Sequence, residues 1–392
     1  MRKYIDIAKE KLKFGTMLSL LSIERYKMYR VSKKYRKENP NGTIRLLDDF
    51  LNFDLSVLNN EKIILFVIYA PKSILMYERY FELLEKLNYK IITISNGKLD
   101  KYFIDSFKDR TLFMAERHNI GRDFGTYKEF IQLLKTNNIQ PKEIIICNDS
   151  IFANLIKSDN RFIEFMQKNE QEDFIGVAEY LWQPGYHVQS YFLKFSNDVF
   201  NGKYFSKFWE DFFISDDRRA NIHNGEIKLS ESILKDGFKP TIFLDTANLI
   251  DTIVDDEVLL QKFLIEVSGN RHLDQHLVGS LKNLHLAFYD KKTTKQQTTY
   301  YKASLKQEIS RLIQRYGIIV VAPFFIIDEF GFPFLKRDLV YRQITDWMLI
   351  TNYAKNFDQE LLSEYLKDQR IRKRPWNFSS LKEKLMYSTG MN

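Results

Sequence analysis

A segment with two arginines and two glycines is the first candidate for chemistry in this sequence. It reads Arg117-His118-Asn119-Ile120-Gly121-Arg122-Asp123-Phe124-Gly125 and lies between a predicted strand and a predicted helix. Arginine donates paired hydrogen bonds to phosphate, glycine allows a close approach of the backbone to a ligand, and a helix N-terminus attracts anions. The segment predicts a phosphate-binding loop, although a structural turn explains it equally well. It is not a P-loop, because no Gly-Lys-Ser or Gly-Lys-Thr ends it.

A single carboxylate, Asp149, follows a predicted isoleucine-rich strand within Asn148-Asp149-Ser150. An acidic residue at the carboxyl end of a strand can hold a divalent cation between the protein and a diphosphate. The alternative is a helix cap or an Asx turn that closes the strand. The spacing leaves both interpretations open.

Two further segments carry polar side chains at suggestive positions. In His187-Val188-Gln189-Ser190-Tyr191-Phe192-Leu193, strand alternation would place His187, Gln189 and Tyr191 on one face, where they would suit recognition of hydroxyl groups. The alternative there is a satisfied core histidine. In Gly225-Glu226-Ile227-Lys228-Leu229-Ser230, Glu226 opens a predicted helix, where it could simply compensate the helix dipole.

The sequence does not predict a zinc site or a disulfide. His272 and His276 are four residues apart, but no glutamate follows His272 as it does in zinc proteases. The single cysteine, Cys147, falls in a predicted buried strand and excludes an intrachain disulfide. A thiol-poor chain fits the cytosol.

Alternating strands and helices must position these residues. Strands are predicted at 62–70, 89–95, 111–115 and 143–147, and helices at 74–87 and 123–135. This alternation is typical of an α/β fold with a mostly parallel sheet flanked by helices. Ligands of such sheets bind at the carboxyl ends of the strands, which is where the loop at 117–125 and Asp149 are expected.

The pattern changes along the rest of the chain. Further strands are predicted at 174–180, 187–195 and 239–245, with helices at 204–212 and 225–236. Beyond about residue 250 the sequence is mostly helical and polar. We therefore divide the chain into a basic helical N-terminal segment at 1–58, an α/β domain at 59–250 and a mostly helical C-terminal region at 251–392.

The positive charge is concentrated at the N-terminus. Residues 1–38 contain 12 Lys and Arg against 4 Asp and Glu, a net charge of +8 that equals the net charge of the whole chain. Met17, Leu18, Leu21 and Met28 recur among these basic residues at near-helical spacing. The segment predicts an amphipathic helix on an anionic membrane surface, or alternatively a helix folded back on the body. Nucleic acid is not expected as a partner, because no recognised binding motif accompanies the charge.

No part of the sequence is expected to span a membrane. The longest uncharged apolar stretches, 14–23 and 316–327, are 10 and 12 residues long, whereas a spanning helix needs about 20. A signal peptide is not expected either, because the N-terminal apolar stretch is weak and no small-residue cleavage site follows it.

Taken in order, the candidate segments resemble the rhamnan synthesis protein F family of polysaccharide-assembling glycosyltransferases, over about residues 60 to 340. The residues that carry the resemblance are Ile64 to Tyr69, Arg117-x-Asn119-Ile120-Gly121-Arg122-Asp123-Phe124-Gly125, Asn148-Asp149-Ser150, His187-Val188-Gln189-Ser190-Tyr191-Phe192, Gly225-Glu226-Ile227-x-Leu229-Ser230 and Pro333-Phe334-Leu335-Lys336-Arg337-Asp338. The resemblance implies that residues 59–250 form a GT-A-like, Rossmann-type catalytic domain that binds a nucleotide sugar, and that residues 251–392 complete the acceptor side.

The resemblance also implies the substrates. The donor would be dTDP-L-rhamnose or a UDP-sugar, and the acceptor a lipid-linked glycan or a growing cell-surface or capsular polysaccharide. The enzyme would then work in the cytoplasm as a peripheral protein at the inner face of the cell membrane, bound there through residues 1–38.

Site roles follow from the same resemblance. We expect Glu226 to act as general base in an inverting displacement and Asp149 to stabilise the diphosphate. Asp211 and Glu231 are the other candidates for the base. Retention of the anomeric configuration is the other possible stereochemical outcome. The expected donor-binding residues are Arg117, Asn119, Gly121, Arg122, Asp123, Asn148 and Ser150, and the expected acceptor- or sugar-binding residues are His187, Gln189 and Tyr191. Asn148 replaces the first aspartate of the usual GT-A metal motif, so the use of Mg²⁺ or Mn²⁺ at Asp149 stays open.

Two other classes of function remain open from the sequence. The chain could be a catalytically silent sugar-binding subunit of a polysaccharide assembly complex, which would bind a donor or glycan without turnover. It could also be a nucleotidyltransferase, which would release pyrophosphate from a nucleoside triphosphate.

Overall fold

The computed structural model describes residues 26, 30, 33–35, 37–39, 42–71, 73–181, 185–216, 221–270, 272–288, 294–341 and 356–364. Most of the basic segment, including Met17, Leu18, Leu21 and Met28, therefore lies outside the described residues, and its predicted amphipathic helix stays a prediction.

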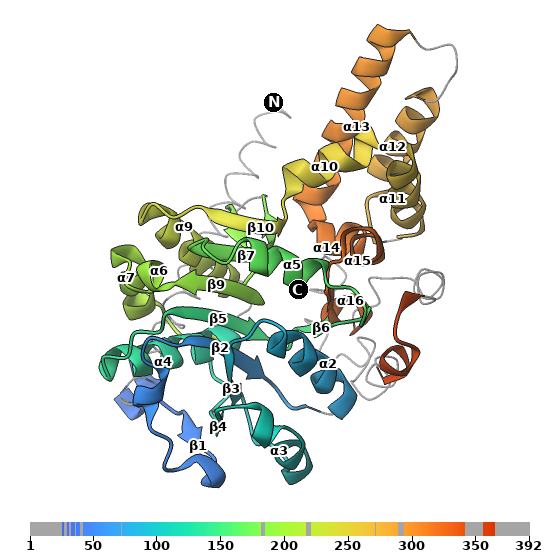
Figure 1. The fold of residues 1–392 in the computed structure, drawn as a ribbon. Coiled ribbons are helices and arrows are strands. Elements are labelled where there is room, and N and C mark those ends of the chain that lie inside the picture. Colours follow the sequence, from blue (N-terminus) through green and yellow to red (C-terminus); the bar gives the residue numbers. More distant parts are fainter. Residues whose placement is uncertain are drawn as a thin grey trace, which may run out of the picture.

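A nine-stranded, mostly parallel sheet forms the centre of the molecule (Figure 1). Its strands are β1 (Arg45–Leu46), β2 (Lys62–Ile68), β3 (Lys90–Ser95), β4 (Phe113–Glu116), β5 (Glu143–Asn148), β7 (Phe174–Tyr180), β8 (His187–Val188), β9 (Phe192–Ser196) and β10 (Pro240–Leu244). The order is β1-β4-β3-β2-β5-β9-β7-β10, with β8 paired to β7. The run from β4 to β5 is parallel, as the sequence predicted, whereas β9 is antiparallel to both of its neighbours.

The strand order changes direction between β2 and β5. The chain runs from β2 through β3 to β4 on one side of β2 and then returns to β5 on the other side. Such a switch point opens a crevice at the carboxyl ends of the two strands. Val67 near the end of β2 is in register with Asn148 at the end of β5, so Asp149 follows immediately beside this crevice.

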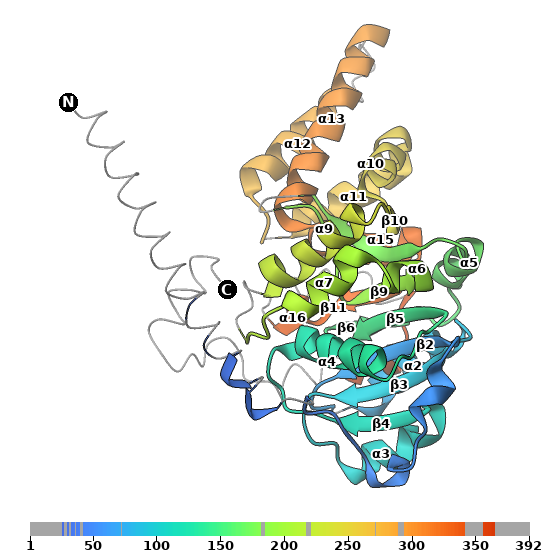
Figure 2. The same cartoon turned by 90° about the vertical axis from the view of Figure 1, so that its left-hand side faces the viewer.

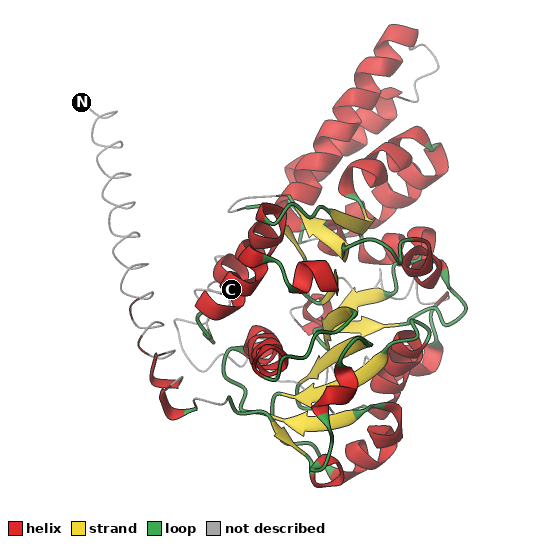
Figure 3. Ribbon diagram, turned by 60° about the vertical axis from the view of Figure 1, so that its left-hand side comes forward, coloured by secondary structure: helices red, strands yellow, loops and turns green. Residues whose placement is uncertain are grey.

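Helices cover both faces of the sheet (Figure 3), and β2 presents six consecutive buried apolar residues, 63–68, to the two faces. Ile64 and Phe66 of β2 point into a core shared with helices α2 (Ile74–Glu85) and α3 (Lys101–Phe107). Ile63 and Leu65 point to the opposite core, shared with α4 (Arg122–Thr136) and α7 (Lys203–Asp211). The shorter helices of this half are η1 (Asp48–Phe50), η2 (Leu55–Leu58), η3 (Lys108–Arg110), α5 (Arg161–Lys168), α6 (Asn197–Phe200), η4 (Asn221–Ile227) and α9 (Lys228–Lys235).

The described part of the C-terminal region is mostly helical, as predicted. It contains α10 (Thr246–Asp255), α11 (Glu257–Gly269), α12 (Gln275–Phe288), α13 (Lys295–Tyr316), α14 (Ile318–Val321), α15 (Pro323–Phe330) and α16 (Arg337–Tyr341). Helices α12 and α13 pair and extend away from the sheet (Figure 1). No helix within the described ranges combines the length and the apolar character needed to cross a bilayer.

One strand brings the C-terminal region back to the central sheet. Strand β11 (Phe334–Lys336) pairs antiparallel with β6 (Ile151–Ala153), which follows β5 almost directly (Figure 2). Lys336 is in register with Ile151. Residues near 337 therefore lie beside Asp149, although nearly 190 positions separate them in the sequence.

The predicted continuous strand at 187–195 is wrong. Strands β8 and β9 both pair antiparallel with β7. Between the pairs Val188–Glu179 and Leu193–Gly176, however, the four residues 189–192 lie opposite only two residues of β7, 177 and 178. The two extra residues bulge out as a turn at Ser190 and Tyr191. A bulge re-aims the side chains around it, so His187, Gln189 and Tyr191 do not share one strand face.

The start of the predicted helix at 225–236 also differs from the expectation. A π-helical stretch, η4, begins at Asn221 and leads into α9 at Lys228. Glu226 therefore lies within a π-helical turn rather than at a helix N-terminus. Such turns are rare and occur frequently at functional sites.

Candidate active site

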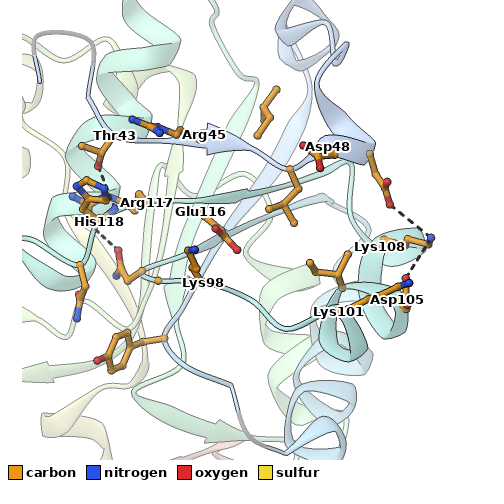
Figure 4. Close-up of a pocket in the computed structure, with 18 residues that line it drawn as sticks. Thr43, Arg45, Asp48, Lys98, Lys101, Asp105, Lys108, Glu116, Arg117 and His118 are labelled. Atoms are coloured by element: carbon orange, nitrogen blue, oxygen red, sulfur yellow. Dashed lines mark hydrogen bonds and ion pairs between the residues drawn. The ribbon is translucent and has the colours of Figure 1, made fainter.

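A cleft lies at the carboxyl ends of β2, β3 and β4 (Figure 4). Its volume is about 1040 Å³, which is at the upper end of the usual range for ligand pockets. The lining residues are Thr43, Arg45, Leu46, Leu47, Asp48, Asp49, Tyr69, Asn96, Gly97, Lys98, Lys101, Ile104, Asp105, Lys108, Glu116, Arg117, His118 and Asn119. A cleft in this place is where a parallel sheet binds its ligands.

Charged side chains of both signs line the cleft, with Asp48, Asp49, Asp105 and Glu116 beside the basic residues. Lys108 is neutralised by ion pairs with Asp49 and Asp105, at 3.7 and 3.6 Å. Lys98 and Lys101 are different, because the described residues provide neither with an ion pair. Lysines without an ion pair attract phosphate groups, whereas Asp48 and Glu116 in the same lining oppose an anion.

Arg117 lines the cleft but directs its guanidinium group into the protein. One terminal nitrogen, Nη2, donates to Glu129 Oε1 at 2.8 Å and to the Ile120 carbonyl at 2.9 Å, and the other, Nη1, donates to Asn96 Oδ1 at 2.7 Å. The side chain is fully buried. Arg117 thus holds the 117–122 loop in place, and the predicted contact with phosphate stays a prediction that this geometry does not favour.

The N-terminal segment is attached to this network. Tyr35 is buried, and its hydroxyl bonds to Glu129 and, at 3.0 Å, to Thr43 Oγ1. Burial alone would raise the pKa of Glu129, but the charge of Arg117 and the hydrogen bonds from Arg117, Tyr35 and Thr43 outweigh it and hold the pKa below its usual value. The end of the basic segment therefore packs on the body beside the cleft.

The two glycines of the loop are explained by packing. A Cβ atom on Gly121, which has a φ of +78°, would lie 2.3 Å from Ile214 Cγ2, and one on Gly125 would lie 2.3 Å from the Ile120 carbonyl oxygen. The exposed residue Arg122 adopts a φ of +53°, which is strained for a residue with a side chain. Asn119 lines the cleft, whereas Gly121, Arg122 and Asp123 lie outside its lining.

Asp149 joins three parts of the molecule through one oxygen. Its Oδ2 accepts hydrogen bonds from the Tyr69 backbone N–H at 3.1 Å, from Arg337 Nη1 at 3.1 Å and from the Tyr77 hydroxyl. Both partners of the Asp149–Arg337 ion pair keep only 9% of their side-chain surface exposed. Because Tyr69 also lines the cleft, the cleft and this buried ion pair adjoin each other at the end of β2.

Asn148, not Asp149, forms the turn that closes β5. Its Oδ1 accepts from the Ser150 backbone N–H at 2.9 Å, which is an Asx turn. Its Nδ2 donates to the Tyr127 hydroxyl at 2.9 Å. The side chain of Asn148 is buried, so both of its polar atoms are used inside the protein.

Glu226 lies in a second polar cluster, on the far side of β5 from the cleft. Ser190 Oγ donates to Glu226 Oε1 at 2.6 Å, and His187 Nε2 is 3.6 Å from Glu226 Oε2. The carboxylate keeps 18% of its surface exposed. The other candidates for a base differ, since Asp211 is exposed and paired with Lys207 and Glu231 is exposed on α9.

Hydrogen bonds define the state of His187. Its Nδ1 lies 3.1 Å from the Gly185 carbonyl oxygen and its Nε2 lies 3.2 Å from Gln189 Nε2. A carbonyl can only accept and an amide NH₂ can only donate, so Nδ1 carries the proton and Nε2 accepts from Gln189. His187 and Gln189 are thus together, as predicted, whereas Tyr191 turns away and packs into the core against Phe334.

Asp123 connects the two carboxylates electrostatically. Burial and the negative charge of Asp149, with a further contribution from Glu226, raise the pKa of Asp123 to about 7, although Arg122 and Arg117 oppose the shift. The charges of Asp149 and Glu226 thus both act on this pKa. We call Asp123, Asp149 and Glu226 the carboxylate cluster.

A family model described as rhamnan synthesis protein F matches residues 91–315, which is more than half of the chain. The chain belongs to the rhamnan synthesis protein F family. It is also 26% identical over 282 residues to the uncharacterized protein y4gN of Sinorhizobium fredii, in an alignment that covers 69% of each chain. Membership of the rhamnan synthesis protein F family links the chain to the synthesis of rhamnan polysaccharide.

The residues matched by the family model include most of the candidate site. The matched range contains every predicted site residue from Arg117 to Glu226, whereas Arg337 lies beyond it. Sequence reasoning noted the segment 333–338 but gave Arg337 no role, and it also missed Tyr77 and Lys98. Nothing local marks Tyr77 or Lys98 as special, and Arg337 becomes informative only when β11 places it beside Asp149.

Proposed function

We propose that this chain is a glycosyltransferase that moves a sugar from a nucleotide-sugar donor to a hydroxyl group of a rhamnan-related polysaccharide. Membership of the rhamnan synthesis protein F family supports the polysaccharide. The observation that carries the enzymatic proposal is that the cleft adjoins the buried carboxylate Asp149 at one sheet edge, because Tyr69 lines the cleft and its backbone N–H donates to Asp149 Oδ2. Transfer from a nucleotide sugar needs a site for a diphosphate next to a group that can accept a proton.

The donor nucleotide occupies the cleft in this proposal. Strands β4, β3, β2 and β5 follow the order 3-2-1-4 of a dinucleotide-binding half-sheet, which supports a GT-A-like, Rossmann-type fold. Lys98 and Lys101 attract the diphosphate, and Asn119 contributes an amide at the cleft wall. The sugar then extends past Tyr69 toward the carboxylate cluster.

Glu226 is the general base of the proposed reaction. It accepts the proton of the acceptor hydroxyl, whose oxygen attacks the anomeric carbon of the donor sugar. The bond from that carbon to the diphosphate oxygen breaks, and the nucleoside diphosphate leaves with the electron pair. Ser190 orients the carboxylate through its hydrogen bond, and the attack from the side opposite the leaving group inverts the anomeric centre.

The proposed acceptor is a lipid-linked glycan, reached at the inner face of the cell membrane. The net charge of +8 in residues 1–38 supports this location, because a basic segment is attracted to anionic lipid. The attachment of Tyr35 beside the cleft would place that segment close to the donor.

A silent sugar-binding subunit is the second candidate, and one observation favours it. Asp149 Oδ2 is occupied by three donors inside the protein, so this carboxylate already has a structural use. Binding without turnover would then be the whole function of the cleft.

Thermal-shift measurements with nucleotide sugars and nucleoside triphosphates test the proposal. Saturation at 100 times Kd stabilises a protein by about 2.7 kcal/mol, so dTDP-L-rhamnose or a UDP-sugar is expected to raise the melting temperature and to do so less in a Lys98→Ala, Lys101→Ala variant. Stabilisation by nucleoside triphosphates with release of pyrophosphate, and by no nucleotide sugar, would show a nucleotidyltransferase instead.

A further inference from the structure

We propose that Arg337 is the resident counter-charge of Asp149 and that the site therefore binds its donor and transfers the sugar without a divalent cation. This inference rests on the proposed function. Transferases that hold a metal at a strand-end carboxylate use it to bridge protein and diphosphate. Here a guanidinium group from the C-terminal region takes the place beside the carboxylate.

The position of Arg337 is fixed at its backbone and at its side chain. The Arg337 backbone N–H donates to the Ser150 carbonyl at 3.1 Å, which ties α16 to the residue after Asp149. Nη1 then reaches Asp149 Oδ2 at 3.1 Å. Strand β11 sets this register through its pairing with β6, so the ion pair is a product of the fold and not of a mobile surface side chain.

The surroundings make this positive charge permanent. The guanidinium carbon lies 4.8 Å from the ring centroid of Phe152 and 5.8 Å from that of Tyr77. Aromatic faces stabilise a cation, and arginine stays protonated at any physiological pH. A buried pair is screened far less by salt than an exposed one, so Asp149 keeps this partner under all working conditions.

The donors around Asp149 Oδ2 do not fit a divalent cation at that oxygen. Mg²⁺ and Mn²⁺ prefer several oxygen ligands in a nearly octahedral arrangement. Asp149 Oδ2 already accepts from three donors, and a metal there would displace them and face the charge of Arg337. Asn148 offers no replacement, because its amide oxygen accepts from Ser150 and its nitrogen bonds to Tyr127. Within the described part of the chain, no group of three His, Cys, Asp or Glu side chains is arranged to hold a metal.

The role that follows for Arg337 is positioning. It compensates the charge of Asp149 at the end of β5 and so holds the junction between the cleft and Glu226 in one geometry. The charge of the leaving diphosphate is then compensated in the cleft, where Lys98 and Lys101 face the ligand. In this arrangement no step requires an ion that has to bind and leave with the nucleotide.

The first test measures metal binding directly on the full-length protein. Electron paramagnetic resonance at room temperature reports free Mn²⁺. We expect the same signal with and without the wild-type protein at Mn²⁺ concentrations up to about 100 µM, which is on the order of tenfold above the Kd of a tight site. In parallel, the Kd of a nucleoside diphosphate measured in EDTA is expected to stay within twofold of the value in Mn²⁺. Stoichiometric loss of the Mn²⁺ signal, or a Kd that rises tenfold in EDTA, overturns the inference.

The second test separates charge from shape at position 337. Arg337→Lys keeps a positive charge, whereas Arg337→Met keeps a long side chain without one. In EDTA, Arg337→Lys is expected to retain turnover within about tenfold of wild type, and Arg337→Met to lose at least tenfold more than Arg337→Lys. A melting temperature measured for each variant reports folding. If Arg337→Met folds and turns over like wild type in EDTA, Arg337 is not the counter-charge.

The two proposals fail in different ways. If no nucleotide sugar is turned over under any condition, the proposed function fails, while the Mn²⁺ measurement still decides whether the site holds a cation. If transfer occurs but stops in EDTA and returns with Mn²⁺, the proposed function stands and the inference is wrong.

Discussion

The cleft and the carboxylate cluster are built in different ways, although they adjoin at one edge of the sheet. The cleft is assembled from consecutive strand ends of β2, β3 and β4, with β1 beside them. The carboxylate cluster is assembled from the end of β5, the start of α4 and the π-helical turn η4, and it is completed by Arg337 from beyond β11. The cleft is therefore a local product of strand–helix alternation, whereas the cluster depends on contacts between distant segments.

This difference predicts how strongly substitutions in each region affect the protein. In the cleft, basic side chains act on a ligand from an open wall, and each contributes modestly because water screens it. In the cluster, the buried Asp149 and Arg337 form an ion pair, and removal of either residue leaves the other charge without its partner. Substitutions should thus have small, graded effects in the cleft and large effects in the cluster.

The largest effect is expected at Glu226. Glu226→Gln keeps the size of the side chain and its contact with Ser190 but cannot accept a proton, so kcat should fall by about 10²–10⁴-fold. The Kd of the donor should change little, because Glu226 does not line the cleft. Glu231→Gln, on the exposed side of α9, is the matched control and should keep the wild-type kcat. If kcat falls equally in Glu226→Gln and Glu231→Gln, Glu226 is not the general base.

The next largest effect concerns stability at Asp149. Asp149→Asn leaves the buried guanidinium of Arg337 without its counter-ion, and loss of one member of such a pair typically costs about 3–5 kcal/mol. Denaturant unfolding should show this loss, and a double-mutant cycle with Arg337→Met should show that the two effects are not additive. Asp211→Asn, which breaks an exposed ion pair with Lys207, should leave stability unchanged. Additive losses would mean that the Asp149–Arg337 pair is not formed in solution.

A third prediction concerns the basic segment that ends beside the cleft. A chain that starts at Arg30 lacks seven of the twelve basic residues of 1–38 but keeps Tyr35 and its bonds to Glu129 and Thr43. Because each basic residue near an anionic surface contributes about 1 kcal/mol, co-sedimentation with anionic vesicles should fall at least about tenfold. The difference should shrink in 1 M salt, where the screening length is about 3 Å.

Neutral vesicles are the control for this experiment. Equal pelleting of the two chains with anionic vesicles would show that residues 1–29 are not the membrane anchor. The segment would then more simply extend the contact that Tyr35 makes with the body.

Smaller effects are expected in the cleft. Lys98→Ala and Lys101→Ala should each raise the Kd of a nucleoside diphosphate by up to about fivefold, which corresponds to about 1 kcal/mol for an exposed charge. Lys108→Ala should have less effect, because Asp49 and Asp105 already neutralise Lys108. Arg122→Ala tests the sequence prediction at the helix start and should have less effect than Lys98→Ala, since Arg122 lies outside the cleft lining. Calorimetry at two salt concentrations measures these Kd values. A larger increase in Kd for Arg122→Ala or Lys108→Ala than for Lys98→Ala would contradict this assignment.

The smallest effect is a pH dependence at Asp123. Its pKa is about 7 in the folded protein against 3.8 for an ordinary aspartate. A raised pKa means that ionisation opposes folding, and the penalty grows from about pH 4 and is complete above pH 7. Asp123→Asn should therefore raise the melting temperature at pH 8, and the gain should diminish toward pH 5. A gain in melting temperature that does not depend on pH would contradict the raised pKa of Asp123.

The sequence predicted the strands β2, β3 and β4 of the cleft but not β1 or α3, which also line it, and it predicted the carboxylate cluster only in part. Continuous apolar runs such as 62–68 identify buried parallel strands, and their order along the chain places their carboxyl ends together. The sequence also pointed to Asp149 and Glu226. It did not reveal that Ser190 and His187 lie beside Glu226 at a bulge, because a two-residue excess is visible only when both halves are paired with β7.

The roles of the two arginines show the same limit. Arg117 looks like a phosphate ligand in a glycine-rich loop, but its ion pair with Glu129 of α4 turns it inward. Arg337 looks like an ordinary basic residue after a short strand, but the pairing of β11 with β6 brings it to Asp149. Local patterns indicate which side chains are available, and tertiary contacts decide which of them face a ligand.

The central claim is that the cleft and Glu226 form one site for sugar transfer, and product analysis of the full-length protein tests it most directly. The protein is incubated in EDTA with dTDP-L-rhamnose or UDP-sugars and a rhamnan-type acceptor, and the nucleotide products are separated by chromatography. The account predicts release of nucleoside diphosphate that requires acceptor and that is lost in Glu226→Gln. Binding of the donor without any product, or release of pyrophosphate from a nucleoside triphosphate, would contradict it.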